Sequence, residues 1–185
     1  MSVLNMAEEI LANMEVKNIS ATFNLGMEVD LFYIYCRTRN SEYSPRDFPG
    51  LRMRMRIPVS CALIFKSGKV NVVGTKNEAD ARLASHKYTK LLQKIGLNVV
   101  FKDYKLNNIV ATIDVHFPIE LEELNRRHMQ FTSYEPEVFA SLSYRLPNMV
   151  FNIFASGKLV VTGAKSRDAI KDAFEYIYKA LVALK

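Results

Sequence analysis

Four phenylalanines occupy matched places in two similar halves of this sequence: Phe48, Phe65, Phe139 and Phe154. Phe48 and Phe139 each lie six residues before an arginine, and the other two each lie two residues before a Ser-Gly-Lys segment. Apolar rings beside cations can wedge between the base steps of duplex DNA while the cations hold phosphates. A place in the core is the ordinary alternative for any one phenylalanine, but the matched pairing favours a nucleic-acid surface.

Residues that could carry catalysis are few. The histidines are His86, His116 and His128, and the basic residues around His86 and His128 predict exposed polar positions. Asp114 and His116 lie two apart on a predicted strand, with no nucleophile nearby in the sequence. The motifs H-E-x-x-H, C-x-x-C and G-x-x-x-x-G-K-[ST] do not occur. We therefore expect no enzyme activity, no metal site and no cofactor.

An internal repeat positions the phenylalanines. Residues 61–76 and 150–165 are nearly the same segment, 89 residues apart, and the apolar residues of the helices that follow recur at the same offset. Two long copies indicate one pseudo-twofold domain, since a solenoid needs three or more shorter repeats. We expect a short N-terminal extension over 1–15, a first repeat over 16–105 and a second over 106–185, with 97–105 as the joint.

Each repeat predicts a strand, a short helix, several strands and a long helix. In the first repeat the strands fall at about 16–24, 48–57, 60–66 and 69–74, with helices at 28–37 and 77–95. In the second the strands fall at about 106–116, 138–146, 149–155 and 158–163, with helices at 119–127 and 166–184. Asn77 and Ser166 are candidate N-caps. Ser-Gly-Lys turns predict antiparallel hairpins, and the fold class is α+β with a ten-stranded antiparallel sheet backed by helices.

The strands are apolar on both faces. Leu63 and Phe65 point to one side and Ala62 and Ile64 to the other, whereas a hairpin with one face in water alternates apolar and polar residues. The amphipathic helices can cover one face, so the other face requires a partner that is not in this chain.

Charge suggests what that partner is. The net charge is +6, and residues 16–105 carry +9 while residues 106–185 are neutral, which suits a polyanion. Cys36 and Cys61 are far apart in sequence and predict reduced thiols in a nuclear or cytosolic protein. No apolar run approaches a membrane span. Leu4, Ala7, Leu11 and Met14 have helical spacing, which predicts a short N-terminal helix, and the acidic residues there argue against a secretory signal.

Several segments together resemble the TATA-box-binding protein family, in its eukaryotic branch. They are R-T-R-N-S-E-Y-S-P-R-D-F (37–48), A-L-I-F-K-S-G-K (62–69), L-L-Q-K-I-G (91–96), F-T-S-Y-E-P-E-V-F (131–139) and V-T-G-A-K (161–165). The resemblance implies a saddle whose concave sheet binds the minor groove of A·T-rich promoter DNA, inserts phenylalanine pairs and bends it. It also implies a nuclear general transcription initiation factor that nucleates preinitiation complex assembly.

The resemblance assigns roles to individual residues. Phe48 with Phe65, and Phe139 with Phe154, match the two wedge pairs. Asn18 and Asn108 match the central pair that donates to minor-groove acceptors. Phosphate contacts match Arg54, Lys69, Arg145 and Lys158, and the apolar and hydroxyl lining matches Leu63, Val110, Val160 and Thr162. Glu135 and Glu137 match the edge that meets transcription factor IIB, and a basic helix used by factor IIA and by regulators matches Arg82, Lys87, Lys90 and Lys94.

Other positions differ from the usual family pattern. Ser20 and Asn71 stand in place of valine, Val73 in place of threonine and Asn152 in place of leucine, all on the expected DNA-binding face. Because an amide can accept from guanine as well as donate to adenine, we expect looser A·T preference at the flanks of the site.

Two other function classes are open. A related factor acting mainly as a protein scaffold, with weak or altered DNA choice, is favoured by these polar substitutions and opposed by the four retained phenylalanines. The third class is an enzyme that uses a similar fold as a recognition platform. The lack of a catalytic cluster in the sequence argues against it. Expected partners are promoter DNA, factors IIB and IIA, TATA-binding-protein-associated factors and regulators, and a second copy of the chain when DNA is absent.

Overall fold

The computed structural model describes residues 3–184. The elements of the first repeat are β1 (Glu15–Asn24), α2 (Leu31–Arg37), β2 (Ser41–Glu42), β3 (Leu51–Arg56), β4 (Val59–Ile64), β5 (Lys69–Thr75) and α3 (Glu78–Lys94), preceded by α1 (Val3–Ala12). Those of the second are β6 (Lys102–Asp114), α4 (Leu121–Arg127), β7 (Thr132–Ser133), β8 (Ser141–Leu146), β9 (Met149–Phe154), β10 (Lys158–Ala164) and α5 (Arg167–Val182).

The strands belong to one antiparallel sheet in the order β2-β3-β4-β5-β1-β6-β10-β9-β8-β7. The predicted α+β class and the ten strands are therefore confirmed. The chain divides into two compact units, which we call the first-repeat unit (Asn18–Asn107) and the second-repeat unit (residues up to Lys17, and from Asn108 onward). Within residues 3–184 no helix is long and apolar enough to cross a membrane.

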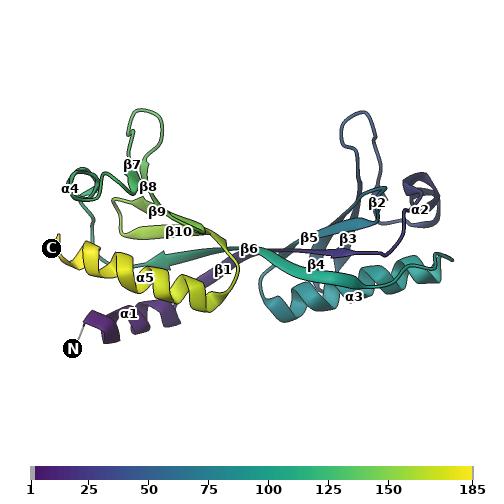
Figure 1. Ribbon diagram of the computed structural model, residues 1–185, viewed down its shortest axis with the longest axis horizontal. Helices are drawn as coiled ribbons and strands as arrows, with labels where there is room; N and C mark the ends of the chain where they lie inside the picture. Colours follow the sequence, from purple (N-terminus) through teal and green to yellow (C-terminus); the bar gives the residue numbers. More distant parts are fainter. Residues whose placement is uncertain (1–2, 185) are drawn as a thin grey trace. The chain divides into compact units, whose positions relative to one another are not determined.

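In the first-repeat unit, α3 covers one face of β3, β4 and β5 (Figure 1). Its side chains Ala84, Tyr88 and Leu92 are fully buried against strand residues such as Met53 and Ile64. The Tyr88 hydroxyl donates to the carbonyl oxygens of Met53 and Ser60 at 3.2 and 3.1 Å and lies 3.1 Å from the Ser60 hydroxyl. Burial raises the pKa of Tyr88 to about 12.

In the second-repeat unit, α5 covers the corresponding face of β10 and lies beside α1 (Figure 1). Ile170, Phe174 and Ile177 of α5 are fully buried. Ala7 of α1 is buried as well, and the Lys171 ammonium lies 3.3 Å from the Glu8 carboxylate. The predicted N-terminal helix is therefore present and packs on α5.

Side-chain caps and turn glycines account for where the long helices begin and where two hairpins turn. The Asn77 side chain accepts from the backbone N–H of Asp80 at 2.7 Å, and Ser166 accepts from that of Ala169 at 3.2 Å, which confirms both predicted N-caps. The hairpins β4–β5 and β9–β10 are antiparallel, as predicted, and each turns through a Ser-Gly-Lys glycine with positive φ.

Several predicted boundaries are wrong. The helix expected over 28–37 begins at Leu31, because Asp30 is its N-cap and Val29 still bonds to the Lys66 carbonyl. The strand expected over 106–116 begins earlier, at Lys102, so the joint expected over 97–105 is shorter. The predicted ranges name eight of the ten strands, and the two-residue strands β2 and β7 complete the number.

The strands expected over 48–57 and 138–146 begin at Leu51 and Ser141. Phe48 and Phe139 lie in the turns before them, where their backbone N–H groups bond to the carbonyls of Ser44 and Glu135. Phe65 lies one residue past the end of β4, so Phe154, at the end of β9, is the one member of the four within a strand.

We predict that Tyr88→Phe lowers the free energy of unfolding by about 1–2 kcal/mol, because buried carbonyl acceptors lose a donor. Urea denaturation measures the change. Tyr35→Phe, at an exposed tyrosine of α2, is the control and should stay within about 0.5 kcal/mol of the parent. Equal effects of both changes would show that the buried hydroxyl contributes nothing specific.

Candidate nucleic-acid interface

Alternate residues of the strands lie on the sheet face that the long helices leave open. We call this the open face of each unit. On β4, Ala62 and Ile64 are fully buried under α3 while Cys61 and Leu63 are only half-buried; on β9, Phe151 and Ile153 are buried while Asn152 is half-buried. The half-buried residues Val73, Val110, Val160 and Thr162 share the open faces. Apolar and polar groups are thus presented together on a surface without its own helix layer.

The first phenylalanine pair is held in place from two sides. The Phe48 and Phe65 rings lie edge to face with centroids 5.7 Å apart. The Arg52 guanidinium lies 4.7 Å from the Phe48 ring centroid and 3.5 Å from the Glu42 carboxylate. Gly50 lies against the rings, where an added Cβ would come within 2.7 Å of Phe48. Both rings remain half-buried, so each keeps an accessible edge.

The second pair is looser. The Phe139 and Phe154 rings are also edge to face, but their centroids are 6.4 Å apart, and Phe139 is 59% exposed. Ser141 stands at the place that Gly50 has in the first repeat, and Ser143 at the place of Arg52. The two repeats therefore present the same ring pair with different supports.

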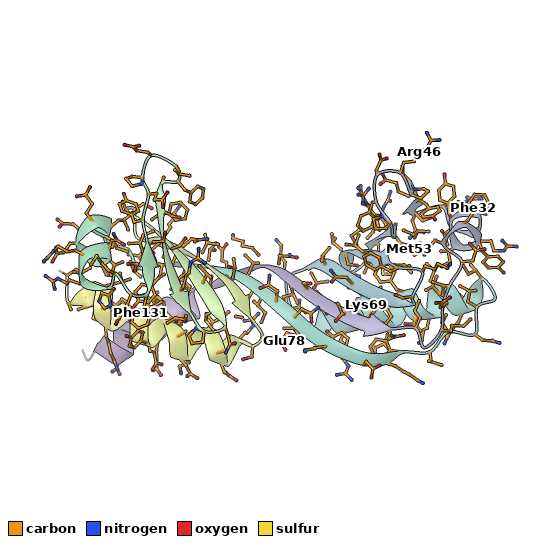
Figure 2. All side chains as sticks on the ribbon, turned by 45° about the horizontal axis from the view of Figure 1, so that its top comes forward. Phe32, Arg46, Met53, Lys69, Glu78 and Phe131 are labelled. Atoms are coloured by element: carbon orange, nitrogen blue, oxygen red, sulfur yellow. The ribbon has the colours of Figure 1, made fainter. Side chains whose placement is uncertain are left out.

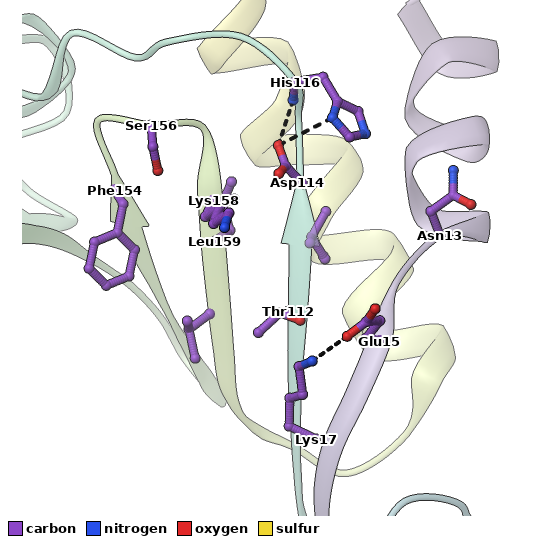
Figure 3. Close-up of a pocket in the computed structure, with 12 residues that line it drawn as sticks. Asn13, Glu15, Lys17, Thr112, Asp114, His116, Phe154, Ser156, Lys158 and Leu159 are labelled. Atoms are coloured by element: carbon purple, nitrogen blue, oxygen red, sulfur yellow. Dashed lines mark hydrogen bonds and ion pairs between the residues drawn. The ribbon is translucent and has the colours of Figure 1, made fainter.

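A groove lies beside Phe154 in the second-repeat unit. It is lined by Phe154, Ser156, Lys158, Thr112 and Lys17, among others, and Lys17 is paired with Glu15 (Figure 3). At its rim, Asp114 accepts from the backbone N–H of His116 at 2.8 Å, and the two side chains lie 3.5 Å apart. The Asp114–His116 pair thus stabilises the turn after β6.

A β-bulge in each unit fixes the orientation of one asparagine amide. Pairing of β1 with β5 shifts register beside Gly74, and pairing of β10 with β6 shifts beside Gly163. The Gly74 N–H donates to Asn18 Oδ1 at 2.8 Å, and the Gly163 N–H donates to Asn108 Oδ1 at 2.7 Å. Each amide oxygen is therefore engaged by the backbone, and each NH₂ group is left to donate elsewhere.

Asn71 and Asn152, two amides at positions where the resemblance leads us to expect apolar residues, are paired with serines. Ser20 Oγ donates to Asn71 Oδ1 at 3.1 Å, and Ser143 Oγ donates to Asn152 Oδ1 at 3.0 Å. All four side chains are half-buried. Each serine hydroxyl thus holds its asparagine amide across two neighbouring strands, and the expectation that these amides loosen the A·T preference stays a prediction.

Cations surround the open faces. Arg54 and Lys69 are exposed in the first-repeat unit, as are Arg145 and Lys158 in the second. A groove of the first-repeat unit is lined by four arginines, Arg39, Arg52, Arg54 and Arg56. Arg46 lies at the tip of the loop between β2 and β3 (Figure 2). Burial raises the pKa of the Cys61 thiol in this groove although Arg54 and Arg52 lower it.

Sequence reasoning missed Arg52 and Ser143. The alternating segment L-R-M-R-M-R contains the signal for Arg52, since residues two apart share a strand face and Arg52 must lie on the side of Arg54. Ser143 has no such signal, because its partner Asn152 is identified only by the register of β8 with β9.

The residues with predicted partner roles lie on a turn and on a helix, not on the strands. Glu135 and Glu137 are exposed in the turn that carries Phe139. Arg82, Lys90 and Lys94 are exposed on α3, and the Lys87 ammonium donates to the Ile57 carbonyl at 2.8 Å.

His86 and His116 are exposed, which confirms the prediction of an exposed position for His86. The His86 ring stacks on Phe101 with centroids 4.0 Å apart. His128 is half-buried, and its Nδ1 lies 3.1 Å from the Tyr144 hydroxyl. The prediction of an exposed His128 is wrong because the end of α4 packs on β8.

Comparison with known proteins identifies the family. A family model described as transcription factor TFIID (or TATA-binding protein, TBP) matches residues 13–95 and 103–184. The chain is 52% identical over 172 residues to the TBP-related factor of Drosophila melanogaster, covering 92% of this chain and 77% of that protein. It is 51% identical over 168 residues to the TATA-box-binding protein of Emericella nidulans, covering 90% of this chain and 63% of that protein.

The fold matches a solved structure of the same kind. The Methanococcus jannaschii TBP structure matches with a TM-score of 0.82 at 36% sequence identity, covering 92% of this chain and 98% of that one. The two matched segments of the family model take in both sets of paired phenylalanines and both bulged asparagines. This chain therefore belongs to the TATA-binding protein family of transcription factors.

Proposed function

We propose that this protein is a transcription initiation factor that binds the minor groove of A·T-rich, TATA-like promoter DNA and bends it. The observation that carries the proposal is the joint presence of two phenylalanine pairs whose rings keep accessible surface and two asparagines whose amide oxygens are held by the backbone. Such amides keep their NH₂ groups available as donors, and A·T pairs offer only acceptors in the minor groove.

In this proposal each group has one role. The phenylalanine pairs enter between base steps and kink the duplex, while the open face follows the widened groove. Arg54, Lys69, Arg145 and Lys158 contact phosphates. The amides of Asn18 and Asn108 donate to adenine N3 and thymine O2.

The bent complex would serve as an assembly platform in the nucleus. Exposed Glu135 and Glu137 would meet transcription factor IIB, and the cations of α3 would meet factor IIA and regulators. These assignments rest on the family resemblance, and binding of each factor to the DNA complex tests them.

A protein scaffold with weak DNA choice is the second candidate. It is favoured by polar residues at positions such as Asn71 and Asn152, where an apolar lining is usual in the family. An electrophoretic shift assay on TATA-containing and scrambled duplexes, repeated at several salt concentrations, separates the two. Equal affinity for both duplexes at every salt concentration would support the scaffold.

We predict that Phe139→Ala and Phe154→Ala each reduce both DNA affinity and bend angle, because unstacking a base step costs about a few kcal/mol that the ring contacts offset. Energy transfer between dyes at the two ends of an A·T-rich duplex measures the bend. Val138→Ala is the control, since Val138 is 77% exposed in the same turn. An unchanged bend angle in both phenylalanine variants would rule out the wedge role.

We predict that Arg54→Ala and Lys69→Ala weaken binding to A·T-rich and scrambled duplexes by similar factors. Each should reduce the slope of log affinity against log salt by about 1, since one phosphate contact is lost. Lys90→Ala removes the same charge from α3 and should leave the slope unchanged. A change in base preference with an unaltered slope would contradict the phosphate assignment.

A further inference from the structure

The strand register places two charged residues at the edge of the open face in the first repeat and two serines at the same place in the second. On β3, Arg52 lies opposite Leu63 of β4 on one side and Glu42 of β2 on the other. The matching residues on β8 and β7 are Ser143 and Ser133, which also lie opposite each other. The first-repeat edge therefore carries a charge pair that the second-repeat edge lacks.

The guanidinium of Arg52 has two weak partners. It lies over the Phe48 ring, 4.7 Å from the centroid, and its Nη1 atom lies 3.5 Å from the Glu42 carboxylate. The side chains of Arg52 and Glu42 are 36% and 59% exposed, so water screens the ion pair, and a cation–ring contact at an exposed site is weak as well. A guanidinium has five N–H donors, and a single carboxylate oxygen at this distance engages few of them.

A DNA phosphate is a stronger acceptor for this group. The planar fork of arginine binds a phosphate through two parallel hydrogen bonds, which are stronger than an exposed ion pair. Under the proposed function the Phe48 ring enters a base step, and a base then takes the ring face that the guanidinium covers. Arg52 must leave the ring at that moment, and the backbone phosphates that flank the same step are the nearest anions.

We propose that Arg52 is a further DNA-contacting residue: as Phe48 enters its base step, the Arg52 guanidinium moves from the ring and from Glu42 to a phosphate of that step. The inference rests on the proposed minor-groove function. Glu42 holds the guanidinium beside the wedge in the free protein and competes with the phosphate for it. Because Ser133 and Ser143 carry no charge, the second wedge gains no such phosphate contact on insertion.

The test replaces each backbone phosphate of an A·T-rich duplex in turn by an uncharged methylphosphonate and measures the affinity of the full chain. We expect wild type to lose about tenfold at the linkage that Arg52 contacts, beside the step that Phe48 enters. Arg52→Ser gives the first repeat the residue of the second. It should lower affinity for the unmodified duplex by about tenfold and reduce the penalty at that one linkage to about twofold.

Matched variants separate this contact from general charge. Arg56→Ser removes the same charge from the same face of β3, but Arg56 lies at the far end of the strand, opposite Val59; its penalty at that linkage should equal that of wild type. Arg52→Lys keeps the charge and should keep most of the penalty, which guards against a folding defect in the serine variant. Glu42→Gln removes the competitor and should raise affinity by about twofold to fivefold, provided that Arg52 is present.

The outcomes are distinct. Failure of wild type to prefer the A·T-rich duplex over a scrambled one would overturn the proposed function itself. Preference for that duplex, with a methylphosphonate profile that Arg52→Ser leaves unchanged, would overturn only this inference. An equal loss of the penalty in Arg56→Ser would also overturn it, because general charge would then explain both variants. A gain from Glu42→Gln that is equally large in the Arg52→Ser background would overturn it as well, since the carboxylate would then act on the DNA directly.

Discussion

The alternation of side chains along the strands is the constraint on which the rest of the structure depends. Each apolar residue buried under a long helix, such as Ala62 or Ile64, sends its neighbours to the opposite face. Cys61 and Leu63 are therefore on the open face whatever their chemistry, and a one-residue slip would exchange the two sets. The helix-covered core thus fixes which groups the open face presents, and the bulges at Gly74 and Gly163 are two local exceptions to the alternation.

The two repeats share a backbone but differ in how they support the same groups. Both bulges hold an asparagine oxygen at nearly equal distances. The phenylalanine pairs differ more, since Arg52 and Gly50 brace Phe48, while Phe139 is largely exposed. Hydrogen bonds of the bulge are set by local geometry, whereas ring positions depend on side chains that have diverged between the repeats.

Much of the fold could be predicted from the sequence because its signals are local. Asn77 and Ser166 act within one helical turn, and the Ser-Gly-Lys turns act within one hairpin. Ser20 and Asn71 are 51 residues apart, and only the sheet register brings them together. Phe48 and Phe139 lie close to apolar strand residues in the sequence, so the predicted strands include them, but backbone hydrogen bonds to Ser44 and Glu135 hold both in turns. The DNA contacts of these residues stay predictions.

The serine–asparagine pairs also affect how the chain can change over time. Replacing Ser20 by valine alone leaves the Asn71 oxygen without its donor, and replacing Asn71 by valine alone leaves a hydroxyl against an apolar neighbour. Because these side chains are half-buried, either single step costs up to about 1 kcal/mol, while the double replacement restores an apolar contact. The same holds for Ser143 and Asn152. Each pair is therefore an epistatic unit, and the members of this family are better compared pair by pair across the strands than position by position along the chain.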